Sequence, residues 1–162
     1  MNTNRLIAIA VFAFSLAARI ALAQQSEIKF TTLLQQTQSA HAQRKNYVIH
    51  SQIEWQKLWR EMQGEQFVRN RASLDSALRK IDFTKQMIIG VFQGEQPSGG
   101  YSIAVAKLVR ANNRLEVYIE EKSPGADCFT TQMLTYPFHI IVTEASVTKV
   151  TFTSRASVAA CR

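Results

Sequence analysis

Features that mark common enzyme classes are missing from this 162-residue chain. Its three histidines, His41, His50 and His139, lack the close spacing of zinc ligands, so we predict no metal site. No serine-elbow, phosphate-loop or zinc-protease helix motif occurs. We therefore predict a protein that is not an enzyme and that needs no cofactor.

Long apolar runs are also scarce, and the one present lies at the N-terminus. Arg5 precedes an apolar stretch that ends near Ala18, and the small residues up to Ala23 suit a cleavage site. This pattern predicts a signal peptide over residues 1–23, cleaved after Ala23. The alternative is an uncleaved membrane anchor, but the run falls short of the roughly 20 apolar residues that span a bilayer. We expect a periplasmic or secreted protein without a stable membrane anchor after cleavage.

Cysteine is rare, and both copies lie in the part that would be exported. Outside the cytosol an even pair favours a disulfide, so we predict a bridge between Cys128 and Cys161. The alternative is two independent cysteines. An enzymatic hypothesis would instead pair Cys128 with His139 in a thiol-dependent hydrolase, helped by Asp127 or Gln132. A disulfide at Cys128 would abolish that chemistry.

Acidic residues are fewer than basic ones, 12 against 19, which gives a net charge of +7. The signs are mixed along the chain and no stacking aromatics accompany the basic residues. This favours a solvated face over a nucleic-acid site, so we predict no nucleic-acid partner. With 46% hydrophobic residues and 19% charged residues, the remainder, residues 24–162, suits a single globular domain.

One segment has a strong helical pattern, from Gln52 to Gln63. Ser51 is a good N-cap, and Glu54 completes a capping box. Apolar residues recur at helical spacing and form one stripe, which indicates packing against a sheet more than a ligand-stacking surface. The stripe consists of Trp55, Leu58, Trp59 and Met62. Residues 65–80 remain open between a short helix and a loop.

The rest of the chain is dominated by strand patterns. Continuous apolar runs and alternation predict strands at residues 28–34, 47–49, 87–92, 101–107, 115–120, 138–142 and 150–153. Asn112 and Asn113 indicate a hairpin turn. We predict an α+β fold: one mainly antiparallel, strongly curled β-sheet with an amphipathic helix packed on it.

Two loops rich in glycine and proline carry the candidate functional residues, and each is bounded by predicted strands. Gly94–Tyr101 and Ser123–Gln132 have sharp turns that preorganise the backbone for binding, although such glycines are also common in purely structural turns. We hypothesise a shared partner-binding surface. Its residues are Pro97, Ser98, Gly99, Gly100, Tyr101, Asp127, Thr131 and Gln132.

Four segments together resemble the C-terminal domain of the PrcB family over about residues 47–153. They are Val48–Trp59, Asp82–Ile89, Gly94–Ile103 and Ser123–Pro137. The family is named for an accessory lipoprotein of a spirochaete protease complex. The resemblance implies an exported, non-enzymatic domain whose partner is another protein, such as a protease or an envelope component. This chain has no lipoprotein cysteine, so the membrane-tethered role does not carry over.

The segment Pro97–Tyr101 also looks like a loop of chagasin-type inhibitors, which enters the active-site cleft of cysteine proteases. The match covers only a few residues, and short motifs of this kind have a high false-positive rate. Protease inhibition through this loop is therefore the alternative function.

Overall fold

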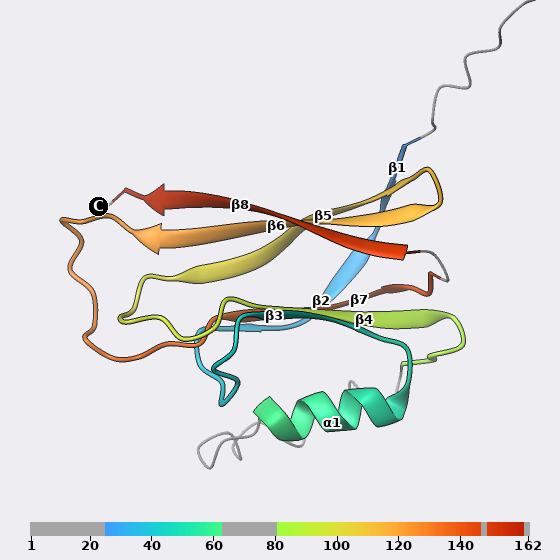
Figure 1. Ribbon diagram of the computed structural model, residues 1–162, viewed down its shortest axis with the longest axis horizontal. Helices are drawn as coiled ribbons and strands as arrows, with labels where there is room; N and C mark the ends of the chain where they lie inside the picture. Colours follow the sequence, from blue (N-terminus) through green and yellow to red (C-terminus); the bar gives the residue numbers. More distant parts are fainter. Residues whose placement is uncertain (1–24, 63–80, 147–148, 161–162) are drawn as a thin grey trace, which may run out of the picture.

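Two four-stranded β-sheets pack face to face, and a helix covers the outer face of one of them (Figure 1). The computed structural model describes residues 25–62, 81–146 and 149–160. The first sheet has the order β1-β5-β6-β8, and the second has the order β2-β7-β4-β3. The elements are β1 (Ser26–Ile28), β2 (Phe30–Gln36), β3 (Lys45–Ile49), α1 (Gln52–Met62), β4 (Gln86–Phe92), β5 (Ser102–Ala111), β6 (Arg114–Pro124), β7 (Phe138–Glu144) and β8 (Lys149–Ala159).

The expected class, mostly β with one helix and mainly antiparallel pairing, is confirmed. The prediction of a single, strongly curled sheet was wrong, because the strands divide into two stacked sheets (Figure 1). One strand pair is also parallel: β6 with β8. The intervening β7 lies in the other sheet, so the chain returns to the first sheet in its original direction.

The N-terminal strand segment serves both sheets. A single strand was expected over residues 28–34, but the chain forms β1 beside β5 and then β2 beside β7. The change of sheet falls at Lys29, whose carbonyl accepts a hydrogen bond from the Thr143 hydroxyl at 2.9 Å. This crossover closes one side of the sandwich.

The second sheet is the middle layer of three, so its central strands are buried on both faces. Alternate residues of β4 divide between two apolar clusters. Met87, Ile89 and Val91 face the first sheet, whereas Ile88 and Phe92 face α1. The prediction that residues 87–92 form a strand buried on both sides is confirmed.

The predicted helix is confirmed and ends at Met62. The Ser51 hydroxyl accepts a hydrogen bond from the Glu54 amide at 3.3 Å, and the Glu54 carboxylate accepts one from the His50 amide at 2.8 Å. These bonds satisfy amide groups at the helix start. Trp55 is buried and stacks on Trp59, which is half-buried, so the stripe is core rather than a ligand surface. Residues 65–80 lie outside the described residues.

The hairpin between β5 and β6 is confirmed, since Asn112 and Asn113 both have positive φ, 47° and 60°. The expected unbroken alternation along β5 was wrong, because the register shifts between Val105 and Lys107. This bulge turns Lys107 outward, where its ammonium lies 4.6 Å from the Tyr118 ring centroid.

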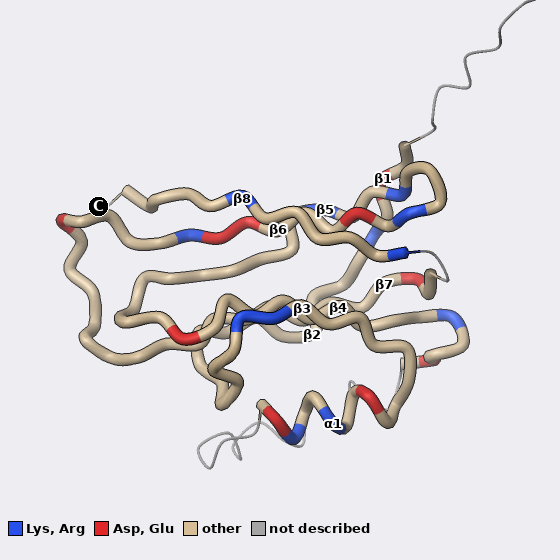
Figure 2. The backbone as a smooth tube through the Cα atoms, viewed as in Figure 1, with Lys and Arg blue, Asp and Glu red and all other residues tan. Residues whose placement is uncertain are grey.

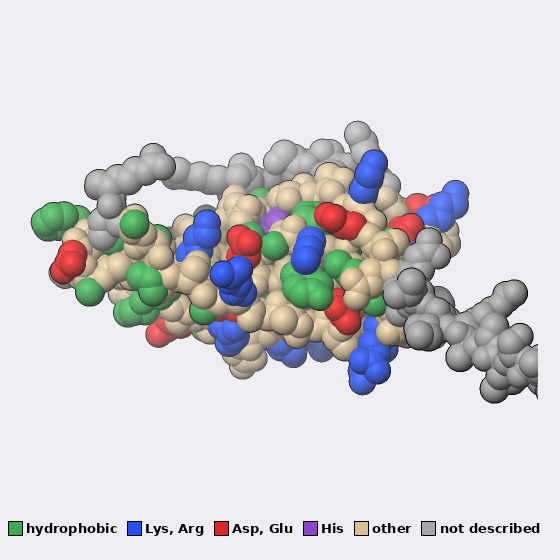
Figure 3. All heavy atoms as spheres, turned by 90° about the horizontal axis from the view of Figure 1, so that it is seen from above, with side chains coloured by type: hydrophobic (Ala, Val, Ile, Leu, Met, Phe, Trp, Pro, Cys, Tyr) green, Lys and Arg blue, Asp and Glu red, His purple; other side chains and the backbone are tan. Residues whose placement is uncertain are grey.

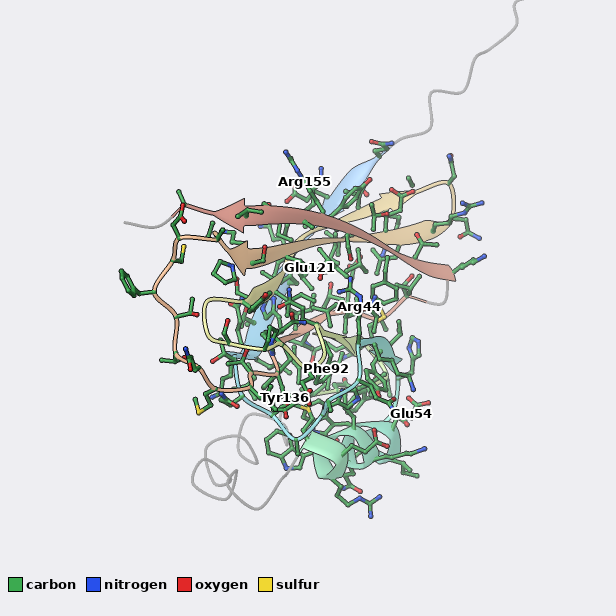
Figure 4. The ribbon with its side chains drawn as sticks, turned by 60° about the vertical axis from the view of Figure 1, so that its left-hand side comes forward. Arg44, Glu54, Phe92, Glu121, Tyr136 and Arg155 are labelled. Atoms are coloured by element: carbon green, nitrogen blue, oxygen red, sulfur yellow. The ribbon has the colours of Figure 1, made fainter. Side chains whose placement is uncertain are left out.

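Two ion pairs of the described residues link the two sheets: Arg110 of β5 with Glu144 of β7, and Arg44 with Glu121. Arg44, just before β3, donates two hydrogen bonds to the Glu121 carboxylate of β6, at 2.6 and 2.5 Å (Figure 4). The Glu121 side chain is only 8% exposed, whereas that of Arg44 is 60% exposed. Elsewhere, charges of both signs are spread over α1 and the first sheet (Figure 2). Within the described ranges no helix is both long and apolar enough to cross a membrane.

Candidate functional site

The two loops singled out in the sequence lie side by side at one end of the sandwich. The amide of Gly99 donates a hydrogen bond to the Thr131 carbonyl at 2.9 Å. Gln96 and Thr135 pair through both backbone hydrogen bonds, and the Thr135 hydroxyl bonds to the Ser98 carbonyl at 2.8 Å. The loops therefore behave as one braced unit rather than as two independent turns.

Two glycines lie where the loops touch. A Cβ atom on Gly99 would lie 2.4 Å from the Thr131 hydroxyl oxygen, so a side chain there would force the Thr131 side chain to move. Gly100 has a φ of +87°, and a Cβ at this position would lie 3.0 Å from the Cβ of Pro124. The left-handed backbone at Gly100 therefore favours glycine, and the missing side chain at Gly99 leaves room for Thr131.

The predicted site residues differ in how far they reach solvent. Pro97, Gly100, Asp127, Thr131 and Gln132 are exposed, while Ser98, Gly99 and Tyr101 are half-buried. Gly99 and Thr131 are in direct contact, and Gly100 and Asp127 line the same hollow. In the described part of the chain, the side chains of Tyr101 and Gln132 make no hydrogen bond.

That hollow is open, has a volume of about 420 Å³, and lies where β6 and β8 end. It is bordered by Phe129, a residue that the sequence reasoning did not select, although its side chain is fully exposed. Met133 and Leu134 of the same loop are about half exposed, and Val158 of β8 is 70% exposed. Figure 3 shows hydrophobic side chains gathered at this end of the molecule. We call the exposed side chains of Phe129, Met133 and Leu134 the apolar tip.

The apolar tip had a signal in the sequence. Phe129, Met133 and Leu134 are large apolar residues in a segment that neither alternates nor follows helical spacing. Such residues belong to no sheet or helix face that could bury them, so this pattern is typical of exposed side chains. Exposed apolar side chains that gather on one loop of a folded protein are candidates for an interaction site.

The base of the loop pair is held by hydrogen bonds among residues that flank the strands of the second sheet. Gln93 donates from its amide to the Pro137 carbonyl at 2.9 Å, and the amide of Tyr136 donates to the Thr37 carbonyl at 2.8 Å. The Tyr136 hydroxyl donates to the Glu95 carboxylate at 3.1 Å. Desolvation, followed by this hydrogen bond, raises the pKa of Tyr136. These bonds hold the base of the loop that carries the apolar tip.

Cys128 and His139, the two residues of the hydrolase hypothesis, contact different parts of the protein. The Sγ atom of Cys128 lies 3.9 Å from the Ala159 carbonyl oxygen, at the end of β8. His139 is buried in β7, where its Nδ1 accepts a hydrogen bond from the Val105 amide at 2.9 Å and its Nε2 bonds to the Thr32 hydroxyl at 2.8 Å. Both imidazole nitrogens are thus engaged in bonds that join strands, which leaves neither to activate a thiol.

Burial lowers the pKa of His139, which favours its neutral form. Because Nδ1 accepts the Val105 hydrogen bond, the ring proton resides on Nε2 and is donated to Thr32. Cys161, the predicted disulfide partner of Cys128, lies outside the described residues. Among the residues that are described, no three His, Cys, Asp or Glu side chains gather as metal ligands would.

These features define a β-sandwich domain with one covering helix and a loop-built surface at one end. Residues 87–144 match the protein-family model described as PrcB C-terminal. The matched residues run from β4 to the end of β7 and include both loops, so the resemblance inferred from the sequence is confirmed for this region. Comparisons with curated proteins and with solved structures gave no significant match.

Proposed function

We propose that this chain is an exported, non-enzymatic domain that binds another protein through the apolar tip and the loop pair behind it. The observation that carries the proposal is the fully exposed Phe129 on a loop fixed by the contact between Gly99 and Thr131. A fixed backbone lowers the entropy lost on binding, and an exposed aromatic side chain is a typical binding hot spot.

The proposed partner is a protease or an envelope component that the domain accompanies. The match to the PrcB C-terminal family supports this choice, because that family is named for an accessory protein of a protease complex. Protease inhibition through Pro97–Tyr101 is the weaker proposal. The two glycines of this segment lie against Thr131 and Pro124, and Tyr101 is half-buried. The segment therefore does not project freely enough to enter an active-site cleft.

Export is part of the proposal, together with a disulfide between Cys128 and Cys161. The position of the Cys128 sulfur beside Ala159, two residues before Cys161 in sequence, supports that pairing. A bridge there would tie the C-terminal end of β8 to the loop that carries Phe129.

The test is affinity capture from the native exported fraction, with the retained proteins quantified by mass spectrometry. We expect Phe129→Ser to reduce retention of the specific partner more than tenfold, as loss of a hot-spot residue does. Ile53→Ser is the matched control, because Ile53 is also a large exposed apolar residue, 78% exposed, but lies on α1.

Equal retention by the two variants would contradict the proposal. The purified chain is also incubated with a panel of cysteine and serine proteases. Inhibition that is lost in Tyr101→Ala and kept in Phe129→Ser would favour the inhibitor function instead.

A further inference from the structure

A second surface runs along β3, the edge strand of the second sheet. Lys45–Ile49 pair with β4 on one side. Across the described residues, no other strand pairs with β3, and no backbone hydrogen bond joins its residues to another segment. The unpaired N–H and C=O groups of an edge strand are a template for one more strand.

A groove follows this edge between β3 and α1. It consists of two open hollows of about 500 and about 250 Å³, which share Lys45, Tyr47 and Glu61 in their linings. The smaller hollow continues to Ile49 and Leu58. The groove thus spans the whole of β3, a length of roughly 17 Å for five extended residues.

One end of the groove contains the buried imidazole of His41. His41 lines the larger hollow, is only 7% exposed, and its Nε2 lies 2.7 Å from the Tyr47 hydroxyl. Among the residues that the structure describes, its Nδ1 has no hydrogen-bond partner. A buried nitrogen without a hydrogen bond is energetically unfavourable. After a small shift of the His41 ring, a hydroxyl or amide group of a bound molecule could bond to Nδ1, and this bond would stabilise the complex.

The charges that line the groove indicate the class of occupant. Lys45 and Lys57 are matched by Glu54 and Glu61, so the lining has no net charge that would favour nucleic acid or phosphate. The charged residues along the groove also make it unlike a lipid-binding site, which is mainly apolar. A polypeptide backbone is uncharged, hydrogen-bonds along its length and fits beside an edge strand.

We propose that this groove binds an extended segment of a partner polypeptide, which adds to β3 as a fifth strand of the second sheet. Alternate side chains of the segment face α1, apolar ones beside Leu58 and a hydroxyl or amide beside His41. None of the groove residues belongs to the loop pair or the apolar tip, so this proposal is independent of the function proposed above.

The test uses the folded protein with residues 63–80 retained. A random library of short linear peptides displayed on phage is selected against it, and a synthetic copy of a selected peptide is titrated by NMR. We expect amide shift changes and new protection from hydrogen exchange at Lys45–Ile49. Lys57→Trp should block the groove and weaken peptide binding at least tenfold. His41→Phe should weaken peptide binding about tenfold.

Gln56→Trp is the matched control, because Gln56 is the exposed neighbour of Lys57 on α1 and lines neither hollow. Its binding should stay within about twofold of the unaltered protein. Failure to select any peptide, shift changes confined to the apolar tip, or equal binding by the two tryptophan variants would overturn the proposal. So would a dimer that Lys57→Trp dissociates, since the occupant would then be a second copy, and so would protection at Lys45–Ile49 that is already complete without peptide.

Discussion

At the scale of single residues, His139 links three strands through one neutral ring. Its Nδ1 accepts from Val105 of β5, its Nε2 donates to Thr32 of β2, and the Phe30 ring packs edge-on against it. A protonated ring would lose the Val105 bond, because Nδ1 would then carry a proton. Val105 adjoins the bulge in β5, beyond the residues of β5 that pair with β1.

This arrangement predicts a pH-dependent stability. Because burial lowers the folded-state pKa of His139, the unfolded chain binds a proton more readily than the native one. The contribution of His139 is therefore complete above the unfolded pKa of about 6.5 and is lost as the pH falls toward the folded value. Urea unfolding between about pH 8 and pH 5 measures it. We expect His139→Gln to flatten this slope and the exposed-residue control His50→Gln to leave it unchanged.

Residue types with a local conformational signature were predictable from the sequence, whereas residues that depend on a distant partner were not. Asn112, Asn113 and Gly100 adopt the positive φ values that their residue types favour. The buried carboxylate of Glu121 had no such signal, because its partner Arg44 precedes it by a long stretch of chain. The close approach of Gly99 to Thr131 depends in the same way on two loops that meet only in the folded protein.

At the scale of elements, the Arg44–Glu121 pair fastens the segment before β3 to the end of β6. Arg44→Met would leave a nearly buried carboxylate without its cation, and we expect a loss of about 1–3 kcal/mol in the free energy of unfolding. Glu121→Gln keeps an acceptor for Arg44 and removes the charge, so its effect should be smaller. Chemical denaturation of both variants measures the difference, and a larger effect of Glu121→Gln would contradict this account.

Elements with a strong local period were predicted well. The stripe from Trp55 to Met62 fixed the helix and its buried face, and the apolar run at Met87–Phe92 fixed a central strand. The division into two sheets was missed because sheet membership depends on non-local pairing. Residues 28–34 have one continuous strand pattern, yet the chain crosses between sheets at Lys29. For β8, nothing local distinguishes its parallel partner β6 from an antiparallel one.

At the scale of the whole molecule, the layered core and the two surfaces have different requirements. The clusters on either side of the second sheet hold the sandwich together and need only apolar residues of suitable size. The apolar tip and the β3 groove lie on different elements, so a variant of one surface should leave the other intact. This separation makes the binding experiments for the two surfaces independent.

The proposed export and the proposed disulfide can be checked together by the intact mass of the protein recovered from the exported fraction. We expect the mass of residues 24–162 less two hydrogen atoms, and no alkylation of Cys128 or Cys161 unless a reductant is added. Reduction should then lower the free energy of unfolding by about 3–4 kcal/mol, because the bridge restricts the unfolded chain. Two thiols that alkylate without reductant would show that the cysteines are independent, and Cys128→Ser would then test whether the thiol carries any activity. A mass that includes residues 1–23 would instead favour an uncleaved N-terminal anchor over a signal peptide.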